Sequence, residues 1–382
     1  MERMIFEEEH ELFRNTFKQF VEKEMVPFNE TWEKNGIVDR ELFEKAGESG
    51  FLGIDLPQKY GGGGINDYRF NQIMGEEFDL AGVATAGSGI GLHNDICVPY
   101  FKEYCNEEQK QRWMPGITKG SLITAIAMSE PGTGSDLASI STTAIKDGES
   151  YVLNGAKTFI SNGINSDLVI VAAKTQPDSK HRGISLLIVE RGMEGFERGR
   201  NLKKAGRHSQ DTAELFFSDV RIPAENLLGE ENEGFYYMMF NLPQERLNIA
   251  ISAVAGTQYA FDLTLEYVKE RKAFGKSIGS FQNSRFKMAE IATELQFAWA
   301  FIDKCSLALT RGELTAEEAA MAKWWTTELQ KRAIDQCLQL HGGYGYMDEY
   351  PISRLWRDGR VQSIYGGTTE IMKEIIGRNL GL

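Results

Sequence analysis

The sequence has few cysteines and no arrangement of them that would hold a metal ion. Cys97, Cys105, Cys305 and Cys337 include no C-x-x-C pair, and none has a histidine at the spacing of a metal ligand. The five histidines are scattered along the chain, and no H-E-x-x-H motif occurs. We therefore expect no metal site, and we expect reduced thiols, as in proteins of a reducing compartment.

Several catalytic and nucleotide-binding motifs are also missing. The chain contains neither G-x-S-x-G nor a P-loop, which argues against an α/β-hydrolase site and a P-loop nucleotide site. Gly87, Gly89 and Gly91 do not form G-x-G-x-x-G, and no strand is predicted before them. A dinucleotide-binding fold is therefore not expected.

Long apolar runs and an excess of positive charge are lacking as well. No apolar segment approaches the roughly 20 residues that a membrane span needs. The first residues, MERMIFEEEHELF, are acidic and amphipathic, unlike a signal or transit peptide. The net charge of −13 argues against nucleic acid and anionic membranes as main partners. A cytoplasmic protein is expected, and a mature organelle protein without its presequence would look the same.

The first 120 residues have the pattern of helices. Phe13, Phe17, Phe20 and Val21 recur at helical spacing and predict one apolar stripe. Helices are expected at 7–25, 40–50, 66–80 and 106–113, with loops at 57–67 and 87–95.

The composition changes near residue 121, where β-branched and aromatic residues become frequent in short runs. Turn dipeptides such as Asp147-Gly148 and Asn154-Gly155 separate these runs. Short strands joined by tight turns predict an antiparallel barrel or sandwich. The expected strands are 121–127, 150–160, 168–173, 184–190 and 213–222.

Helical character returns near residue 231. Pro243 is expected at a favourable position in the first turn of a long helix, and Thr315 with Glu318 forms a capping box. The expected helices are 243–271, 283–310, 315–340 and one that begins near 369. The order of helices, strands and helices predicts an α+β fold of mostly helical content. The predicted domains are 1–120, 121–229 and 230–382.

Two glycine-rich stretches are candidates for chemistry. AMSEPGTGSD, residues 127–136, follows an expected strand, and its turn leaves N–H groups and hydroxyls free, as an anion-binding nest requires. Residues 339–370 mix glycines with aromatic residues, which suits a flat apolar cofactor with polar edges. By composition alone, a connecting loop is the better interpretation of the first stretch, and tight helix packing explains the second equally well.

Taken in this order and at this separation, the two stretches resemble the acyl-CoA dehydrogenase family over essentially the whole chain. NLPQERLNIA, ERKAFGKSIGSFQ, QLHGGYGYMDEYPISRLWRD and IYGGTTEIMKEII look most like its long-chain and isovaleryl branch. The resemblance implies an N-terminal helical domain, a middle antiparallel β-barrel and a C-terminal four-helix bundle. It also implies FAD, an acyl-CoA substrate, a homotetramer, and electron transfer to electron-transferring flavoprotein in fatty acid β-oxidation. The implied reaction leaves a trans-2-enoyl-CoA, with the α-proton going to a carboxylate and the β-hydride to flavin N5.

The resemblance assigns residues to the flavin. Met128 and Ser129 would lie along the isoalloxazine edge, and Phe159 stands where many relatives have Trp. Ser161 would donate a hydrogen bond near flavin N5, where negative charge develops. Part of the set, from Arg271 to Gln282 and from Gln339 to Gly343, would hold the FAD of a neighbouring subunit. The residues implied for FAD are Ile126, Ala127, Met128, Ser129, Gly134, Ser135, Phe159, Ile160, Ser161, Arg271, Phe274, Gln282, Gln339, Leu340, His341, Gly342, Gly343, Thr368, Thr369 and Glu370.

The resemblance also locates the catalytic base. Medium- and short-chain relatives have Tyr-Glu-Gly-Thr in the loop that here reads YGGT, residues 365–368, so the catalytic carboxylate is missing there. The long-chain and isovaleryl branch carries it on the long helix after the barrel, where Glu245 matches. Gly366 would keep the backbone N–H that grips the thioester carbonyl, and its lack of a side chain would leave room for the carboxylate. The residues implied for acyl-CoA are Ser135, Tyr236, Pro243, Gln244, Arg246, Tyr365, Gly366 and Gly367.

Other functions stay open at this point. An acyl-CoA oxidase, a 2-enoyl-CoA reductase and a non-catalytic protein that binds acyl-CoA or FAD are alternatives on the same fold. Intact flavin loops and a base candidate argue against the non-catalytic protein. Oxidases of the family are commonly longer, which favours dehydrogenation, but the sequence does not decide which electron acceptor is used. A base at the position of Glu245 serves both long straight and short branched substrates in the family, so no acyl chain length is predicted.

Overall fold

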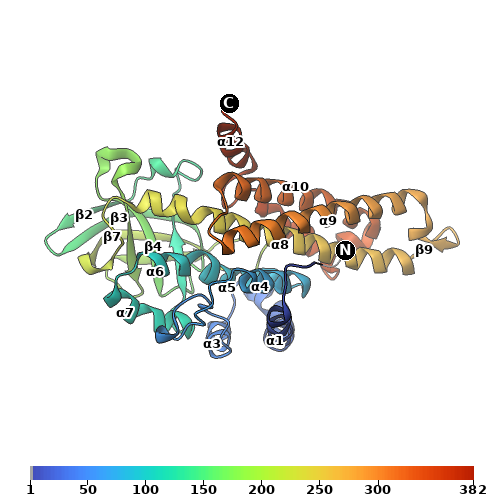
Figure 1. Cartoon of the computed structure of the whole chain (residues 1–382), viewed down its shortest axis with the longest axis horizontal. Helices are drawn as coiled ribbons and strands as arrows, with labels where there is room; N and C mark the ends of the chain where they lie inside the picture. The colour runs from blue at the N-terminus through green and yellow to red at the C-terminus, as the bar shows by residue number, and fades with distance from the viewer. Residues whose placement is uncertain (1–2) are drawn as a thin grey trace.

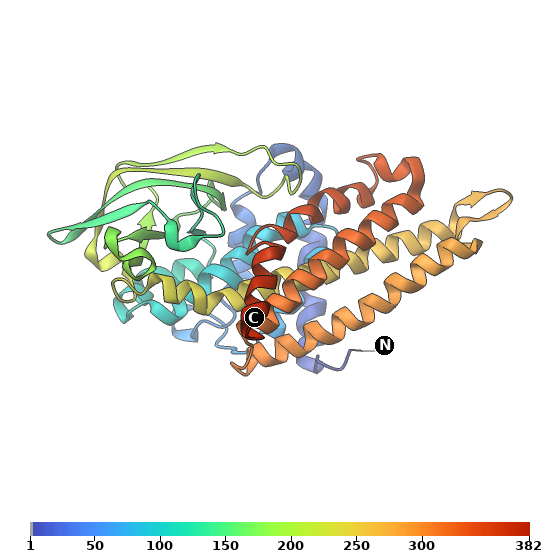
Figure 2. The same ribbon diagram turned by 90° about the horizontal axis from the view of Figure 1, so that it is seen from above.

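The computed structural model describes residues 3–382, and its helices and strands follow the predicted order (Figure 1). N-terminal helices lie beside the middle strands, and the long C-terminal helices extend away from the sheet (Figure 1, Figure 2). The chain thus has the predicted α+β fold of mostly helical content.

An aromatic core holds the N-terminal helices together. Phe17, Phe20 and Val21 of α1 are buried and Phe13 packs against them, which confirms the predicted apolar stripe. The rings of Phe17 and Phe51 meet edge to face with centroids 4.8 Å apart, a geometry that aromatic pairs favour. The N-terminal helices are α1 (Glu8–Glu24), α2 (Asn29–Asn35), α3 (Glu41–Glu48), α4 (Arg69–Leu80), α5 (Ala84–Gly91), α6 (Val98–Tyr104) and α7 (Glu107–Thr118).

The prediction of a loop at 87–95 is wrong, because these residues are helical. α5 runs into a π-helical turn, Leu92–Cys97, which leads directly into α6. Gly87 allows close packing and does not form a turn. A Cβ at this position would lie 2.4 Å from the Phe78 ring. π-Helical turns are frequent at functional sites.

The middle strands form one eight-stranded sheet in the order β6-β7-β3-β2-β4-β5-β8, with β1 also paired to β4. The five predicted strands are present, whereas the short strands β2, β6 and β8 were not predicted. Most ladders are antiparallel, as expected, but β1 and β2 each pair with β4 in parallel. The strands are β1 (Thr124–Ala127), β2 (Thr143–Asp147), β3 (Ser150–Ser161), β4 (Leu168–Lys174), β5 (Ile184–Glu190), β6 (Phe196–Asn201), β7 (Thr212–Pro223) and β8 (Leu227–Leu228).

Four C-terminal helices match the predicted ones except at the start of the first, whereas α11 (Pro351–Gly359) was not predicted. The N–H of Glu318 donates to Thr315 Oγ1, so the capping box is confirmed. The predicted place of Pro243 is wrong, because α8 begins at Gly234 and the proline lies inside the helix. The helices are α8 (Gly234–Glu270), α9 (Gln282–Thr310), α10 (Ala316–His341), α11 (Pro351–Gly359) and α12 (Thr369–Asn379), and β9 (Lys272–Ala273) pairs with β10 (Lys276–Ser277) in a hairpin.

α8 connects the regions of the molecule. It lies against β5 near its start and packs on α4, α9 and α10. This packing offsets the roughly 3 kcal/mol that an interior proline costs a helix. Although α8 has 37 residues, neither it nor another helix of residues 3–382 combines the length and apolarity needed to cross a membrane.

Candidate active site

A cavity of about 200 Å³ lies where α4, α5, the π-helical turn and α8 meet the loop before α12. Four predicted site residues line it: Glu245 from α8, Ser161 from the end of β3, and Tyr365 and Gly366 from the loop. The fold therefore brings the predicted base and the predicted thioester-gripping glycine to one place.

Glu245 is buried, and its carboxylate accepts a hydrogen bond from the Tyr100 hydroxyl at 3.2 Å. Burial raises the pKa of Glu245 to about 7, although the Tyr100 hydrogen bond and the charge of Arg246 lower it in part. A carboxylate with a pKa near neutrality is suited to act as a general base. Sequence reasoning missed Tyr100, because its contact with α8 depends on how α6 packs.

Gly366 and Gly367 both have backbones in the left-handed region, with φ of 63° and 100°. A Cβ on Gly366 would lie 2.3 Å from Ile249 Cδ1. The space beside Gly366 is thus filled by Ile249, one helical turn after Glu245, and not by the carboxylate as predicted. The left-handed backbone favours glycine here, and a Cβ would also push the end of the Ile249 side chain aside.

The end of β3 presents an open aromatic face. Phe159 is 72% exposed and has a φ of 60°, and Ser161 faces the cavity. Ile160, between them, is buried in the sheet. Of the three residues assigned to the flavin here, Phe159 and Ser161 have side chains free to contact a ligand.

A buried ion pair fixes the loop that follows β1 to the neighbouring strand β3. Sequence reasoning did not predict this pair. The buried Lys157 Nζ donates to Met128 O at 2.9 Å and to Glu130 Oε1 at 3.0 Å. Burial acts to raise the pKa of Glu130, but the charge of Lys157 and hydrogen bonds from Ser141 and Thr142 hold it at about 2. The two segments assigned to the flavin are thereby fixed to each other.

Side chains of the loop after β1 differ in exposure. Ala127 is buried in the sheet and offers only backbone atoms, and Ile126 packs against the core. Met128 and Ser129 are half-buried, whereas Gly134 and Ser135 are exposed. None of these residues lines the cavity of Glu245.

Other residues assigned to FAD gather at the opposite end of α8. Arg271 lines a hollow there with residues 340–343, and Phe274, in the β9–β10 hairpin, is 95% exposed. The hairpin projects from the end of the bundle (Figure 2). At 1.5 Å per helical residue, Arg271 lies roughly 40 Å from Glu245. These residues do not reach the cavity of their own chain.

Some of the residues assigned to FAD at this end of α8 have side chains that are already engaged in packing. The His341 ring is buried, stacks on Tyr267 with centroids 4.3 Å apart, and its Nδ1 donates to Cys337 O. Its side chain therefore packs the fold. Gln282, Gln339, Gly342 and Gly343 are exposed, and Leu340 is half-buried.

Thr368, Thr369 and Glu370 start α12 beside the loop of Gly366. Thr368 Oγ1 accepts from the N–H of Ile371 and caps the helix. Thr369 donates to Glu328, and Glu370 is exposed outside the cavity lining. A helix N-terminus is a favourable place for a diphosphate, and Glu370 is not placed to serve as the base.

Four residues assigned to acyl-CoA lie on α8 outside the cavity lining. Tyr236 is half-exposed, Pro243 is partly buried, and Gln244 donates to Asp95 O at 2.9 Å. Arg246 is buried, and its Nε has no hydrogen-bond partner among the described residues. Ser135 and Gly367 also lie outside the lining, so these substrate roles stay predictions.

The cavity wall is more polar than expected. Asp95, on the π-helical turn, accepts hydrogen bonds from Asn71 and Asn248, and Asp79 and Arg207 also line the cavity. Burial raises the pKa of both aspartates to about 7. Sequence reasoning missed Asp95 because it treated 87–95 as a loop.

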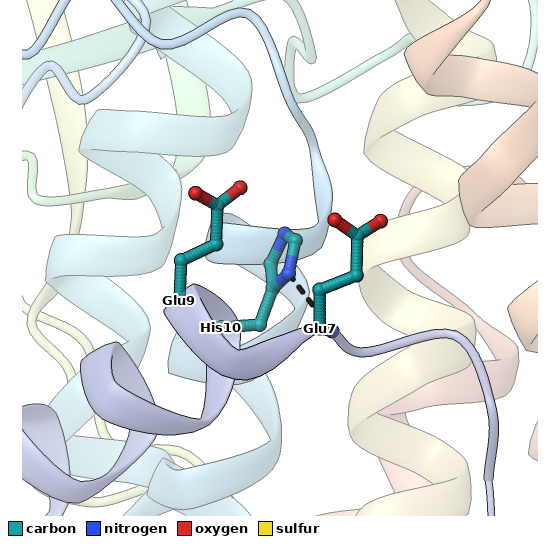
Figure 3. A group of neighbouring side chains, drawn as sticks. All are labelled: Glu7, Glu9 and His10. Carbon is teal, nitrogen blue, oxygen red and sulfur yellow. Dashed lines mark hydrogen bonds between the residues drawn. The ribbon is translucent and has the colours of Figure 1, made fainter.

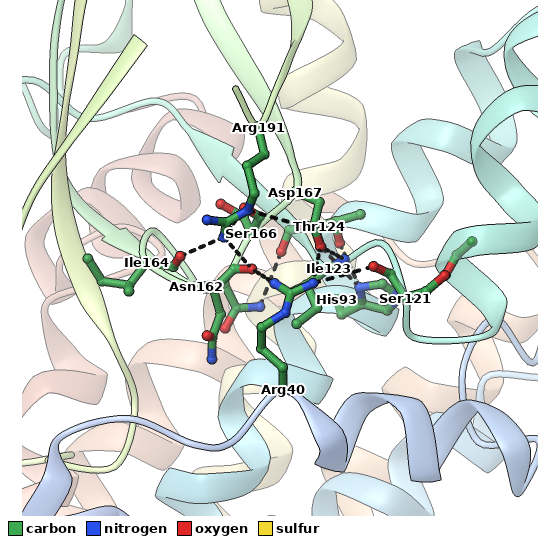
Figure 4. Close-up of polar contacts among 12 residues, drawn as sticks. Arg40, His93, Ser121, Ile123, Thr124, Asn162, Ile164, Ser166, Asp167 and Arg191 are labelled. Atoms are coloured by element: carbon green, nitrogen blue, oxygen red, sulfur yellow. Dashed lines mark hydrogen bonds and ion pairs between the residues drawn. The ribbon is translucent and has the colours of Figure 1, made fainter. Parts of the chain in front are cut away.

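A polar network ties the sheet to the N-terminal helices (Figure 4). Asn162, directly after Ser161, donates to the carbonyls of Gly89 and Thr124 at 3.0 and 3.1 Å. Asp167 accepts from the N–H of Ile123 and pairs with Arg40 and Arg191. The network fixes the strand end that carries Ser161.

Among the described residues, one group has the spacing of a metal site: Glu7, Glu9 and His10 (Figure 3). His10 Nδ1 accepts from the Glu7 N–H at 3.1 Å, and Nε2 lies 3.2 Å from Asp67 Oδ2. Both ring nitrogens are therefore engaged, and the group is explained as a cap of α1. The four cysteines are buried and unpaired.

Three family models match the chain. The N-terminal domain of acyl-CoA dehydrogenases matches residues 7–121, the middle domain 125–220, and the C-terminal domain 232–381. These matches leave only short segments uncovered.

Individual relatives agree in length and sequence. The mitochondrial long-chain specific acyl-CoA dehydrogenase of Sus scrofa is 49% identical over 99% of this chain and 88% of that protein. The acryloyl-CoA reductase (NADH) of Anaerotignum propionicum is 37% identical over 100% of this chain and 97% of that protein. The prediction of a long-chain relative is confirmed, and a reductase stands among the relatives.

Solved structures show the same fold. An acyl-CoA dehydrogenase from Geobacillus kaustophilus superimposes with a TM-score of 0.97 at 52% identity over the whole of both chains. A structure described as the electron transferring flavoprotein of Acidaminococcus fermentans superimposes with a TM-score of 0.94 at 35% sequence identity, and the match covers 99% of both chains.

Proposed function

Because the chain belongs to the acyl-CoA dehydrogenase family, we propose that it oxidises a saturated acyl-CoA to the trans-2-enoyl-CoA with FAD. Members of this family are oxidoreductases that act on CH–CH bonds and bind FAD. The observation that carries the proposal is the meeting of Glu245 and Gly366 at one cavity. Removing an α-proton from a thioester needs a base on one side and a donor to the carbonyl on the other.

Glu245 is the proposed base. Its burial removes water from the carboxylate, and the raised pKa brings it near working pH. Tyr100 holds the carboxylate through one hydrogen bond, which leaves the second oxygen free to take the α-proton. The backbone N–H of Gly366 would donate to the thioester carbonyl, where negative charge develops.

The residues present fit FAD. The exposed ring of Phe159 offers a flat apolar face beside Ser161, and the N-terminus of α12 suits a diphosphate. When bound, FAD supplies the acceptor for the β-hydride.

We also infer that a second copy completes each site in a homotetramer. Arg271, Phe274 and residues 339–343 lie too far from the cavity to serve their own chain, which supports a role toward a neighbour. Electron-transferring flavoprotein is the proposed electron acceptor, as the resemblance to the acyl-CoA dehydrogenase family implies. The proposed location is the cytoplasm, or an organelle matrix by analogy with the mitochondrial relative.

A reductase is the second candidate, because the Anaerotignum propionicum relative carries that name. The same cavity would serve, with a protonated Glu245 giving its proton to the α-carbon of an enoyl-CoA. The direction of the reaction then depends on the electron partner.

Anaerobic titration with saturated acyl-CoAs tests the proposal. The FAD-loaded protein should lose its flavin absorbance with one chain class, whereas Glu245→Gln should keep FAD and stay oxidised. Bleaching that persists in Glu245→Gln would reject this base. The reductase would be established instead if saturated thioesters leave the flavin oxidised and enoyl-CoA reoxidises the reduced flavin of the protein.

A further inference from the structure

A second chamber of about 210 Å³ lies next to the catalytic cavity, between α2, the turn at 81–83 with the start of α5, α8, α10 and α11. We call it the distal chamber. It shares Asp79, Ala84 and Arg207 with the lining of the catalytic cavity. These shared residues form the boundary between the two spaces.

One face of α8 runs past both spaces. Glu245, Ile249 and Ser252 line the catalytic cavity, and Tyr259 lines the distal chamber. Their spacing, with Gly256 between the last two, places them on one side of the helix. At 1.5 Å per residue, Tyr259 lies about 21 Å beyond Glu245, a distance on the scale of an extended long acyl chain.

Gly256 lets polar groups approach the boundary. A Cβ there would lie 2.9 Å from both Asp79 Oδ1 and Gln330 Nε2. A larger residue would push these side chains away. The face of α8 between the two spaces is therefore covered by hydrogen-bonding groups, where the wall of an alkyl pocket would have methyl groups.

Three amide oxygens in the distal chamber lining lack partners. Asn29 Oδ1, Gln330 Oε1 and Gln362 Oε1 belong to residues that are more than nine-tenths buried, and none accepts a hydrogen bond from the described residues. Buried acceptors in folded proteins are nearly always satisfied. A ligand that donates hydrogen bonds would satisfy them.

Two acidic groups of the chamber lining are paired within the protein. Glu33 pairs with Arg357 at 3.2 Å, and Asp358 accepts from the Arg207 N–H at 2.7 Å and the Thr85 hydroxyl at 3.1 Å. The buried lining atoms without a partner are neutral amide oxygens, which favour a ligand that donates a hydrogen bond. The half-buried Arg354 and the exposed Glu30 of the lining stand outside these ion pairs, so the test below includes an anionic chain end.

We propose that the distal chamber binds the far end of a long acyl chain that carries a hydroxyl group. This inference rests on the proposed function and adds the substrate class. An alkyl end would bury methylene groups against polar side chains and leave the amide oxygens unpartnered. A hydroxyl end can donate to one of them and accept from a neighbouring amide N–H.

Three thioesters of equal chain length test this inference: hexadecanoyl-CoA, ω-hydroxyhexadecanoyl-CoA and hexadecanedioyl-CoA. Flavin reduction of the FAD-loaded protein is followed as kcat/KM and normalised to butanoyl-CoA, which is too short to reach the chamber. The hydroxy substrate should exceed the alkyl one by at least about tenfold. Equal rates, or a preference for the alkyl chain, would overturn the inference while the proposed function stands.

Variants distinguish an effect of the distal chamber on substrate preference from a general loss of stability. Gln330→Leu and, independently, Gln362→Leu should abolish the preference for the hydroxy substrate. Gln336→Leu is the matched control, because Gln336 Oε1 is also buried without a partner but lies outside the chamber lining. This control should keep the preference.

Two other outcomes reject the inference. A preference for the dicarboxylate would show that the partly exposed Arg354 of the lining selects an anion. If no thioester, butanoyl-CoA included, reduces the flavin, the proposed function fails and this inference fails with it.

Discussion

Tyr100 holds the carboxylate that we propose as the base, so its hydroxyl should set the pH dependence of the reaction. Tyr100→Phe removes a hydrogen bond that lowers the pKa of Glu245. The pH at which kcat/KM reaches half its maximum should rise by roughly one unit, since such a bond is worth about 1–2 kcal/mol. Tyr104→Phe, which loses a contact with Asn241 instead, should leave the midpoint unchanged. An unshifted midpoint in Tyr100→Phe would contradict the role.

Burial of Glu245 should also appear in the stability of the protein. The pKa of Glu245 rises from 4.5 in the unfolded chain to about 7 in the folded protein. As the pH rises, the unfolded chain therefore loses this proton first, and the free energy of unfolding falls between about pH 4.5 and pH 7. Glu245→Gln removes the effect. The variant should match the wild type near pH 4 and exceed it above pH 7 by as much as about 3 kcal/mol in urea unfolding. A constant difference across pH would reject the raised pKa.

Gly366 combines a left-handed backbone with contact to Ile249. Gly366→Ala should lower the melting temperature and slow flavin reduction, because strain of about 1–3 kcal/mol adds to the clash. Adding Ile249→Val, which removes the contacting Cδ1 and little else, should recover part of the melting temperature. Gly377→Ala is the control: it lies inside α12 with open space at its Cβ, and it should be neutral or stabilising. Equal melting temperatures for Gly366→Ala and wild type would refute this account.

At the scale of elements, sequence patterns predicted the long helices and the strong strands, because their periodicity reflects one buried face. They failed where glycine packs closely inside a helix, as Gly87 does in α5, and where proline lies inside a helix, as Pro243 does in α8. The base could be located through its motif. Tyr100 and Asp95 could not, since their importance comes from contacts between elements that are distant in the sequence.

The loop after β1 depends on the buried pair of Lys157 and Glu130. Lys157→Met leaves the Glu130 carboxylate buried without its cation, which should cost about 3–5 kcal/mol and reduce the FAD retained on purification. The double variant Lys157→Met/Glu130→Gln should regain stability. Thermal unfolding and the ratio of flavin to protein absorbance measure both effects. A single variant as stable as the wild type would show that the pair does not hold the loop.

At the scale of the whole molecule, each site should need two chains. Glu245→Gln lacks the base, and Arg271→Ala lacks a residue placed roughly 40 Å from it. Each variant alone should be nearly inactive, with Arg271→Ala losing FAD. Co-expressed, they should regain activity, because a mixed pair of subunits has one site with both residues intact. Activity that stays at the level of the separate variants would show that sites are not shared.

The position of Glu245 on α8 has a consequence for durability. A base on a surface loop can be displaced while the rest of an enzyme stays folded. Here the carboxylate sits on the helix around which α4, α9 and α10 are packed, so moving it means opening the core. Heating should therefore not displace the base while the core around α8 stays folded. Loss of proton transfer through displacement of Glu245 should therefore coincide with unfolding of the core.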